Sequence, residues 1–258
     1  MHHPDNSDRV AVVTGGAKGI GAEVCWRLAA AGYTVVVADL DESAADTLVA
    51  ALKAAGHRAE AQALDVGDPA SVGRAFVDVA QRHDRCDVLV NCAGIAKVFP
   101  FLEFPLDNFV TTMNVNVTGT LLCSQHAARL MVKRNWGRIV NIASVAGMRA
   151  VGTGRTAYGT SKGAVIALTR QMAVELAEHG ITANAVSPGP VDTPRTRVLH
   201  TDRFRQQYTH AIPIDRYGST SEVAAAVMYF VGDEAGYTTG VSLAVDGGFL
   251  AAGARKLP

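Results

Sequence analysis

Short apolar runs alternate with longer segments of mixed polarity along this chain. Strands that are buried on both faces are continuously apolar, so each run predicts an interior strand of a parallel sheet. We therefore expect strands over residues 10–13, 34–39, 58–64, 88–91, 138–142, 182–186 and 242–245. The segments between them predict helices over residues 19–31, 42–55, 69–83, 106–133, 156–178 and 221–231.

The alternation of strand and helix predicts an α/β fold, a single doubly wound parallel sheet of the Rossmann type with helices on both faces. No linker, repeat or low-complexity tract divides the 258 residues, so we expect one domain over residues 1–258. Residues 1–8 are polar, and we expect them to be flexible. Residues 194–215 are rich in arginine, and we expect an irregular segment there.

Composition narrows the class of protein. Lysine and arginine together number 24, as do aspartate and glutamate, so no net charge favours nucleic acid or an anionic membrane as a partner. No apolar run reaches the roughly 18–20 residues of a membrane span, and the N-terminus lacks an apolar signal core. The cysteines lack Cys-x-x-Cys spacing and metal partners, so we expect buried thiols, no metal site and a reducing, cytoplasmic location; they are Cys25, Cys86, Cys92 and Cys123.

A glycine-rich turn follows the first strand and opens the first helix. It reads Thr14-Gly15-Gly16-Ala17-Lys18-Gly19-Ile20-Gly21. A pyrophosphate needs free backbone N–H groups, the positive end of a helix dipole and no Cβ in its way, and glycines 15, 19 and 21 supply these. The turn therefore predicts a dinucleotide site, although its spacing differs from Gly-x-Gly-x-x-Gly.

Asp39 ends the second strand, where a carboxylate accepts hydrogen bonds from an adenosine ribose and repels a 2′-phosphate. Lys18 points the other way, because a cation in the glycine turn would attract that phosphate. We give the carboxylate more weight and predict NAD rather than NADP. A solvated aspartate at a strand end is the alternative interpretation of Asp39.

Tyr158 and Lys162 stand one helical turn apart, on the same face of a predicted helix. An ammonium group favours the phenolate over the phenol, which prepares a tyrosine for general acid/base work at neutral pH. Tyr-x-x-x-Lys arises by chance in many chains, so the pair gains its meaning from the motifs around it.

Together with the glycine turn, these motifs make the chain resemble the short-chain dehydrogenase/reductase family, in its compact single-domain branch. The resemblance runs from about Val10 to Gly248. It is carried by the order of several motifs: Thr14 to Gly21, Asp65-Val66, Asn91-Cys92-Ala93-Gly94, Asn116-Val117-Thr118-Gly119, Ser144, Tyr158 with Lys162, Pro188-Gly189 and Asp246-Gly247-Gly248.

The resemblance implies a catalytic set of four residues. Tyr158 would be the general acid/base, and Lys162 would support its ionisation and bind the nicotinamide ribose. Ser144 would hold the substrate oxygen, and Asn116 would shape the long helix so that a water links Lys162 to solvent. Ser144 could also be a strand-end hydroxyl, and Asn116 a helix-bending or capping residue.

The resemblance also implies cofactor contacts beyond the glycine turn. Asp65 would meet the adenine, and Thr193 the carboxamide. Asp65 could instead cap the helix near Pro69, and Thr193 could be a turn residue before Pro194. The full set of implied cofactor residues is Gly15, Lys18, Gly19, Ile20, Gly21, Asp39, Asp65, Val66, Asn91, Ala93, Gly94, Tyr158, Lys162, Pro188, Gly189, Val191 and Thr193.

The chain departs from the family pattern in two places. Cys92 replaces the second asparagine of Asn-Asn-Ala-Gly, which is a mild change at a packing position. Ala143 replaces the first of two serines, so Ser144 supplies a single hydroxyl. The interval from Ser144 to Tyr158 is also one residue longer than usual, which a loop absorbs.

These residues predict an NAD-dependent oxidoreductase that interconverts a secondary alcohol, such as a polyol or sugar alcohol, and its ketone. Residues 194–215 would form a substrate lid, whose arginines (Arg195, Arg197, Arg203 and Arg205) suit an anionic or polyhydroxylated substrate. Arg149 and Arg155, nearer to Ser144, could also contact an anionic or polyhydroxylated substrate. A solvated helix face is the alternative interpretation of this charge run.

Three other functions remain open. The first is a 3-oxoacyl thioester (carrier-protein) reductase using NADPH, for which Lys133-Arg134 could form half of a docking patch, although Glu178-His179 stands where a second cation would help. The others are a cofactor-binding scaffold without catalysis and a sugar-nucleotide epimerase. The resemblance further implies a homotetramer that pairs its long helices and its C-terminal strands.

Overall fold

The computed structural model describes residues 6–252, except for the side chains of Arg195 and Leu199. The first five residues of the segment expected to be flexible therefore lie outside the described part. Asn6 is buried and donates a hydrogen bond from Nδ2 to the Ala31 carbonyl oxygen at 3.0 Å.

A parallel sheet of seven strands runs through the described chain in the order β3-β2-β1-β4-β5-β6-β7. This order reverses direction between β1 and β4, as in a doubly wound fold. The predicted fold class is confirmed. The strands are β1 (Val10–Thr14), β2 (Thr34–Asp39), β3 (Ala59–Ala63), β4 (Val88–Asn91), β5 (Gly137–Ile142), β6 (Ile181–Pro188) and β7 (Ser242–Val245).

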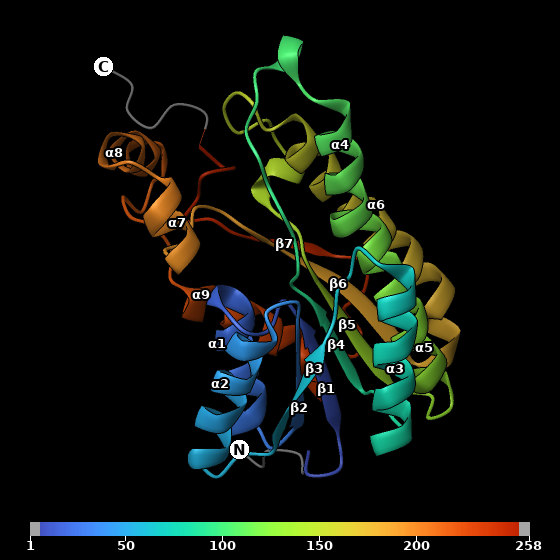
Figure 1. Cartoon of the computed structure of the whole chain (residues 1–258). Coiled ribbons are helices and arrows are strands. Elements are labelled where there is room, and N and C mark those ends of the chain that lie inside the picture. Colours follow the sequence, from blue (N-terminus) through green and yellow to red (C-terminus); the bar gives the residue numbers. More distant parts are fainter. Residues whose placement is uncertain (1–5, 253–258) are drawn as a thin grey trace.

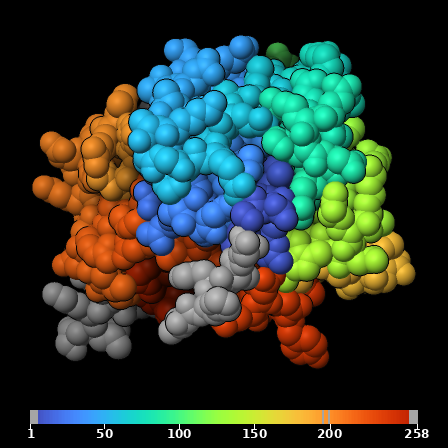
Figure 2. All heavy atoms as spheres, turned by 90° about the horizontal axis from the view of Figure 1, so that it is seen from below, coloured from blue at the N-terminus to red at the C-terminus, as the bar shows by residue number. Residues whose placement is uncertain are grey.

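Helices cover both faces of the sheet (Figure 1). One face carries α1 (Gly19–Ala30), α2 (Glu42–Ala54) and α9 (Thr220–Val231). The other carries α3 (Pro69–His83), α4 (Leu106–Met113), α5 (Gly119–Val132) and α6 (Thr156–Leu176). Figure 2 looks from below and shows the N-terminal part, in blue, between the C-terminal part in orange and the middle of the chain in green.

Burial explains why the apolar runs become strands. Every residue of β1, β4, β5 and β6 is buried, because helices pack on both faces of these strands. Two hydrophobic cores result, one beneath α1, α2 and α9 and one beneath α3, α5 and α6. Burying such apolar area stabilises the fold by about 25 cal/mol per Å².

The predicted helix over 106–133 is interrupted at its centre. Residues Asn114–Thr118 form one π-helical turn between α4 and α5. The segment expected to be irregular is helical instead, with α7 (Pro194–Leu199) and α8 (Asp202–Ala211). Single 3-10 turns lie at Phe101–Glu103, Val145–Gly147, Ala177–His179 and Asp233–Ala235.

Candidate active site

The residues singled out in the sequence gather at the carboxyl edge of the sheet. β1, β4, β5 and β6 all end there, and α7 and α8 lie above the same edge (Figure 1). In open α/β sheets this edge binds ligands where the strand order reverses. Here the reversal falls between β1, which leads into the glycine turn, and β4, which leads into Ala93-Gly94.

The glycine turn is built so that side chains are excluded from it. Gly15 and Gly19 have φ values of 62° and 59°, a region in which L-residues are strained. A Cβ on Gly15 would lie 2.8 Å from the Cα of Ala93, and one on Gly21 would lie 2.1 Å from the Gly15 carbonyl oxygen. The turn therefore packs against the loop after β4 and opens α1, in a form that fits a pyrophosphate.

Asp39 is oriented by the glycine turn itself. Its Oδ2 accepts a hydrogen bond from the Ala17 backbone N–H at 3.0 Å, and its Oδ1 accepts one from Asp41 at 3.0 Å. Lys18 forms an ion pair with Asp41 at 2.5 Å, and the Asp41 hydrogen bond raises the pKa of Lys18, with a smaller contribution from the Asp39 charge. Lys18, the cation that would favour NADP, is thus already paired with a carboxylate.

Lys162 and Asn116 meet beneath the loop after β4. Lys162 is buried, and its Nζ donates to the Ile142 carbonyl oxygen at 2.6 Å. A Cβ on Gly94 would lie 3.6 Å from that Nζ and 3.2 Å from Asn116 Oδ1. The Lys162 Nζ lies 5.8 Å from the centroid of the Tyr158 ring, so the ammonium and the phenol belong to one site.

Asn116 lies in the π-helical turn and joins three elements. Its Oδ1 accepts from the Ile95 N–H at 2.8 Å, while its Nδ2 donates to the Ile95 carbonyl and to Ser161 Oγ at 3.0 and 2.9 Å. Ser161 Oγ donates in turn to the Tyr158 carbonyl oxygen at 2.8 Å. The chain resolves the choice between the two asparagines, since Asn114 instead donates to Gly67.

Ser144 stands just after β5 and begins a 3-10 turn. Its Oγ accepts from the Ala146 N–H at 3.1 Å, and the residue is buried. That turn packs tightly on α6, because a Cβ on Gly147 would lie 2.5 Å from the carbonyl carbon of Lys162. Tyr158 packs against Val145 and Ala146, so Ser144 is held beside the same first turns of α6.

Three other predicted residues have structural contacts of their own. Asn91 is buried, and its Nδ2 donates to Ser124 and Asn141 inside the sheet layer. Val66 packs against Gly119. Asp65 is exposed and accepts from the Gly67 N–H at 2.8 Å. It does not cap α3, whose N-cap is Asp68.

The loop after β6 faces the glycine turn. Gly189 donates to the Val245 carbonyl oxygen, so Pro188-Gly189 ends β6 close against β7. Val191 is buried, and Thr193 is the N-cap of α7, accepting from Thr196 at 3.1 Å. A Cβ on Gly19 would lie 3.8 Å from Thr193 Cβ, so these two segments border the same space.

The predicted lid, α7 and α8, presents aromatic rings, and two of its arginines are paired. Tyr208 stacks on Phe204 and on Phe249, with centroids 5.3 and 5.6 Å apart. Arg197 and Arg205 both pair with Asp192, at 2.8 and 3.1 Å. The side chain of Arg195 lies outside the described residues. Arg197 and Arg205 are therefore neutralised, whereas the exposed Arg203 forms no ion pair within residues 6–252.

Comparison with known proteins identifies the family. Residues 15–250 match the family model described as enoyl-(acyl carrier protein) reductase. The 3-oxoacyl-[acyl-carrier-protein] reductase FabG of Aquifex aeolicus is 36% identical over 243 residues, covering 94% of this chain and 97% of that protein. The short-chain reductase protein NovJ of Streptomyces niveus is 38% identical and covers 94% of each chain. This chain belongs to the short-chain dehydrogenase/reductase family.

Solved structures agree. A gluconate 5-dehydrogenase from Burkholderia cenocepacia, in complex with NADP and tartrate, superposes with a TM-score of 0.91 at 32% identity. The alignment covers 97% of this chain and 100% of that one. As a short-chain dehydrogenase/reductase, the chain is an oxidoreductase that acts on alcohol or keto groups with NAD(P), as the resemblance implied.

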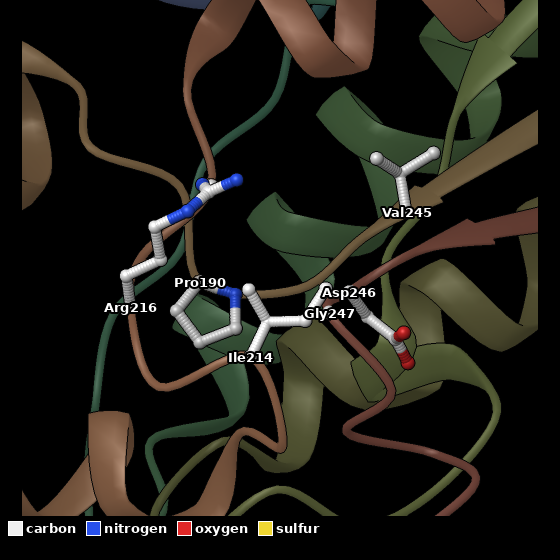
Figure 3. A pocket seen from close by; sticks show the side chains of 7 residues that line it. Pro190, Ile214, Arg216, Val245, Asp246 and Gly247 are labelled. Carbon is white, nitrogen blue, oxygen red and sulfur yellow. The ribbon is translucent and has the colours of Figure 1, made fainter.

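Two cavities of this dehydrogenase differ greatly in size. One of about 970 Å³ opens beside the start of α6 and is lined in part by Phe99, Phe101, Met148, Arg149, Val151 and Arg155. The other, of about 30 Å³, lies at the base of the lid between Pro190, Ile214 and Gly247, and the Asp246 carboxylate points away from it (Figure 3). The second holds about one water molecule. The first is large enough for a small molecule and is bordered by Gly159 and Thr160, which follow Tyr158 on α6, so it is the candidate substrate cavity.

Two residues of the site escaped the sequence analysis. Thr14 Oγ1 accepts from the N–H groups of Cys92 and Ala93 at 3.2 and 3.3 Å, tying the end of β1 to the loop after β4. Ser161 links Asn116 to the backbone of Tyr158. The sequence could have indicated these two residues only by their positions, since Thr14 precedes Gly15 and Ser161 precedes Lys162.

The remaining expectations concern metals, membranes and thiols. Within residues 6–252, His, Cys, Asp and Glu side chains form no cluster that could hold a metal ion. Nor is any helix in that range long and apolar enough to cross a membrane. Burial raises the pKa of Cys92 to about 11 and that of Cys123 to about 12, so both carry protonated thiols at neutral pH.

Proposed function

We propose that this enzyme interconverts a secondary alcohol and its ketone by NAD-dependent hydride transfer, with Tyr158 as the general acid/base. The observation that supports this most is the convergence of Tyr158, Lys162, Ser144 and Asn116 at one edge of the sheet. A polyol, a sugar alcohol or a related hydroxy compound is the proposed substrate, since the gluconate 5-dehydrogenase shares the fold over nearly its whole length.

Each side chain has a distinct task in this proposal. Tyr158 gives a proton to the carbonyl oxygen during reduction and removes one from the hydroxyl during oxidation. Ser144 holds the same oxygen, while Lys162, held by its hydrogen bond to the Ile142 carbonyl oxygen, lies beside the Tyr158 ring and binds the nicotinamide ribose. Asn116 keeps the Ile95 backbone in place and supports the water that connects Lys162 to solvent. When bound, the nicotinamide supplies or accepts the hydride.

The glycine turn and the loops after β4 and β6 together fit a dinucleotide. The positive φ values of Gly15 and Gly19 leave the start of α1 open for the pyrophosphate. Ala93, Gly94, Pro188, Gly189, Val191 and Thr193, together with Asp65, Val66, Asn91, Ile20 and Gly21, would border the rest of the cofactor.

NAD is the proposed cofactor because Asp39 is fixed where an adenosine ribose would lie, and Lys18 is paired with Asp41. Asp39→Ala should raise kcat/KM with NADP relative to NAD by at least about tenfold. The control is Asp41→Ala, which releases Lys18 but leaves Asp39 in place. If Asp41→Ala changes the preference and Asp39→Ala does not, Lys18 governs the choice.

Tyr158→Phe tests the reaction itself. The variant lacks the proton-transferring hydroxyl but keeps the ring, so NAD should bind with an unchanged Kd while turnover falls at least about a hundredfold. Steady-state rates with NAD and with NADP over polyols, hydroxy acids and simple secondary alcohols provide the measurement. Near-normal turnover in the variant would rule out the assignment.

The second candidate is an NADPH-dependent 3-oxoacyl thioester reductase, favoured by the similarity to the Aquifex FabG. That function would need a basic docking patch for the carrier protein near the active site, and the candidate patch Lys133-Arg134 does not meet this need. Lys133 and Arg134 follow α5, at the edge of the sheet where β5 starts, and both lie near Asp84 at 3.4 and 3.9 Å. Within one chain they are therefore remote from Tyr158, and retained activity on 3-oxoacyl thioesters with NADPH alone would favour this candidate.

We also propose that the enzyme acts as a homotetramer in the cytoplasm. The family resemblance supports the tetramer, and the free, largely buried cysteines suit a reducing compartment.

A further inference from the structure

Arg155 differs from Arg197, Arg205 and Arg216 because no carboxylate of the described chain pairs with it. Arg197 and Arg205 pair with Asp192, and Arg216 pairs with Glu222 at 2.6 Å. Within residues 6–252, Arg155 forms no ion pair and no side-chain hydrogen bond. It is nevertheless only half exposed and lines the cavity of about 970 Å³.

The backbone position of Arg155 gives it no structural task either. It is the N-cap residue of α6, a position that favours Ser, Thr, Asp and Asn, and its side chain makes no capping hydrogen bond. The guanidinium is partly buried at the cavity wall and has no structural partner within residues 6–252, so it is a candidate for ligand binding.

The charge of Arg155 is directed toward the space between α6 and the lid. After burial, which is the larger cause, Arg155 lowers the pKa of His200. Burial raises the pKa of Tyr208, and the charge of Arg155 opposes that rise. Tyr158 also interacts electrostatically with Tyr208 and adds to the rise in its pKa. Arg155 precedes Tyr158 by three residues, a spacing that puts both side chains on one side of the first turn.

The rest of the cavity wall is mainly apolar and aromatic. Arg149 lies over the Phe249 ring at 5.6 Å, which occupies it in a cation–π contact. Glu103 is the acidic residue of the lining, and it is exposed on the 3-10 turn Phe101–Glu103. An anion that enters this cavity therefore meets the Arg155 guanidinium, which has no carboxylate or aromatic partner within residues 6–252 and stands at the start of the helix that carries Tyr158.

We propose that Arg155 binds the carboxylate of a hydroxy-acid or oxo-acid substrate whose reacting carbon lies at Tyr158. This rests on the proposed function and narrows its substrate class. A carboxylate accepts two parallel hydrogen bonds from a guanidinium, which fixes the orientation of the substrate as well as its affinity. Because Arg155 and Tyr158 are so close in the chain, the carboxylate stands only a few bonds from the hydroxyl-bearing carbon.

The test compares hydroxy acids with their neutral methyl esters, for example 3-hydroxybutyrate and 4-hydroxycyclohexanecarboxylate, with NAD as cofactor. The wild-type enzyme should prefer the acids. Arg155→Gln should lower kcat/KM for the acids by about 10- to 100-fold and change that for the esters by less than about threefold. Arg155→Lys should restore part of the loss, and Arg170→Gln, an exposed arginine on the same helix, should behave as wild type.

Other outcomes separate this inference from the proposed function. An equal loss on acids and esters in Arg155→Gln overturns the carboxylate role, as does a wild-type preference for esters. A preference for coenzyme A thioesters that depends on Arg155 would also overturn the inference, because Arg155 would then bind a phosphate group rather than a carboxylate. Calorimetric binding of 3-hydroxybutyrate to the NAD complex needs no turnover. Acid binding that Arg155→Gln leaves unchanged contradicts the inference even if Tyr158 proves not to be catalytic.

Discussion

At the scale of single residues, Asn116 holds the site together more than any other side chain. It satisfies both the N–H and the carbonyl of Ile95 and also binds Ser161, all from a buried position. The backbone around Ile95 leaves the sheet just after β4 and has no strand partner of its own. The amide thus replaces the sheet hydrogen bonds that end at Asn91.

We expect Asn116→Ala to destabilise the fold by about 2–4 kcal/mol, because it leaves buried donors and acceptors without partners. Turnover should fall further than stability explains, since Lys162 borders the same space. Thermal melts and kcat at a temperature where the variant is folded measure the two effects.

The control for that experiment is Asn114→Ala, which removes one hydrogen bond to Gly67 from the same π-helical turn. Its activity should stay near that of the wild type. Equal losses of activity in both variants would mean that the turn as a whole, rather than the Asn116 amide, supports the site.

Motif order singled out Asn116, Ser144, Tyr158 and Lys162 as candidates, but it did not predict their hydrogen-bond partners. The contacts to Ile95 and Ile142 are made by backbone atoms, which every residue possesses, so no side-chain pattern announces them. Thr193 illustrates a related limit. A threonine before proline is a helix N-cap signal as well as a turn signal, and only the fold shows that α7 begins there.

At the scale of elements, the lid depends on Asp192. Its carboxylate accepts hydrogen bonds from Arg197 of α7 and Arg205 of α8, so one residue fastens both helices to the loop after β6. These helices escaped prediction because α8 is polar around most of its surface and buries no residue completely. Phe204 and Tyr208 lie one turn apart on its partly buried face, but two rings among ten mostly polar residues are too few to mark a helical period along the sequence.

We expect Asp192→Asn to loosen the lid and raise KM about three- to tenfold, with little effect on the Kd for NAD. Amide hydrogen exchange over residues 194–211 should accelerate, while exchange in β4 and β5 stays slow. Asp84→Asn, which removes an exposed ion pair at the other edge of the sheet, is the control. A rise in the Kd for NAD in Asp192→Asn alone would instead connect this carboxylate to the cofactor.

The lid contact also has a defined pH range. The hydrogen bond from Arg197 lowers the pKa of Asp192, and that from Arg205 adds to the effect. The folded protein therefore keeps this carboxylate ionised below its usual pKa, and the contact weakens only as pH falls through the lowered value. Substrate KM should consequently stay constant from neutral pH to about pH 5, as far as Asp192 determines it.

The capping box of α9 gives a second pH-dependent element. The Arg216 hydrogen bond, followed by the Ser219 N–H, lowers the pKa of Glu222 to about 2. A depressed carboxylate pKa adds stability above its unfolded value, and that stability is lost as pH falls from about 4.5 toward 2. Glu222→Gln should lower Tm by roughly 2–4 °C at pH 7. The difference from wild type should shrink on acidification; a constant difference would assign the effect to packing.

At the scale of the whole molecule, the alternation of apolar runs was enough to predict the sheet and both helical layers. Parallel strands require crossover helices, which leaves few arrangements of such a pattern. The edge on which a residue falls follows from its place in each strand–helix unit. Lys133 and Arg134 show the consequence, since they precede β5 and so lie away from the site at its other end.

Assembly is the property that the pattern along the chain constrains least, because exposed and buried apolar residues share one periodicity. The described chain leaves Tyr237, Val241 and Leu243 exposed at β7, an edge strand whose outer backbone groups have no neighbouring strand. Pairing with the β7 of a second copy would cover these apolar side chains and the unpaired backbone groups, in line with the proposed homotetramer.

Light scattering should therefore give a mass near four times the 27.1 kDa of one chain. Leu243→Asp should yield smaller species, because it places a charge at the proposed contact. Val77→Asp, at an exposed position on α3, should leave the mass unchanged. A wild-type mass of 27.1 kDa would exclude the tetramer, whereas a tetramer unaffected by Leu243→Asp would move the contact away from β7, to surfaces such as the exposed Leu106 and Val110 of α4.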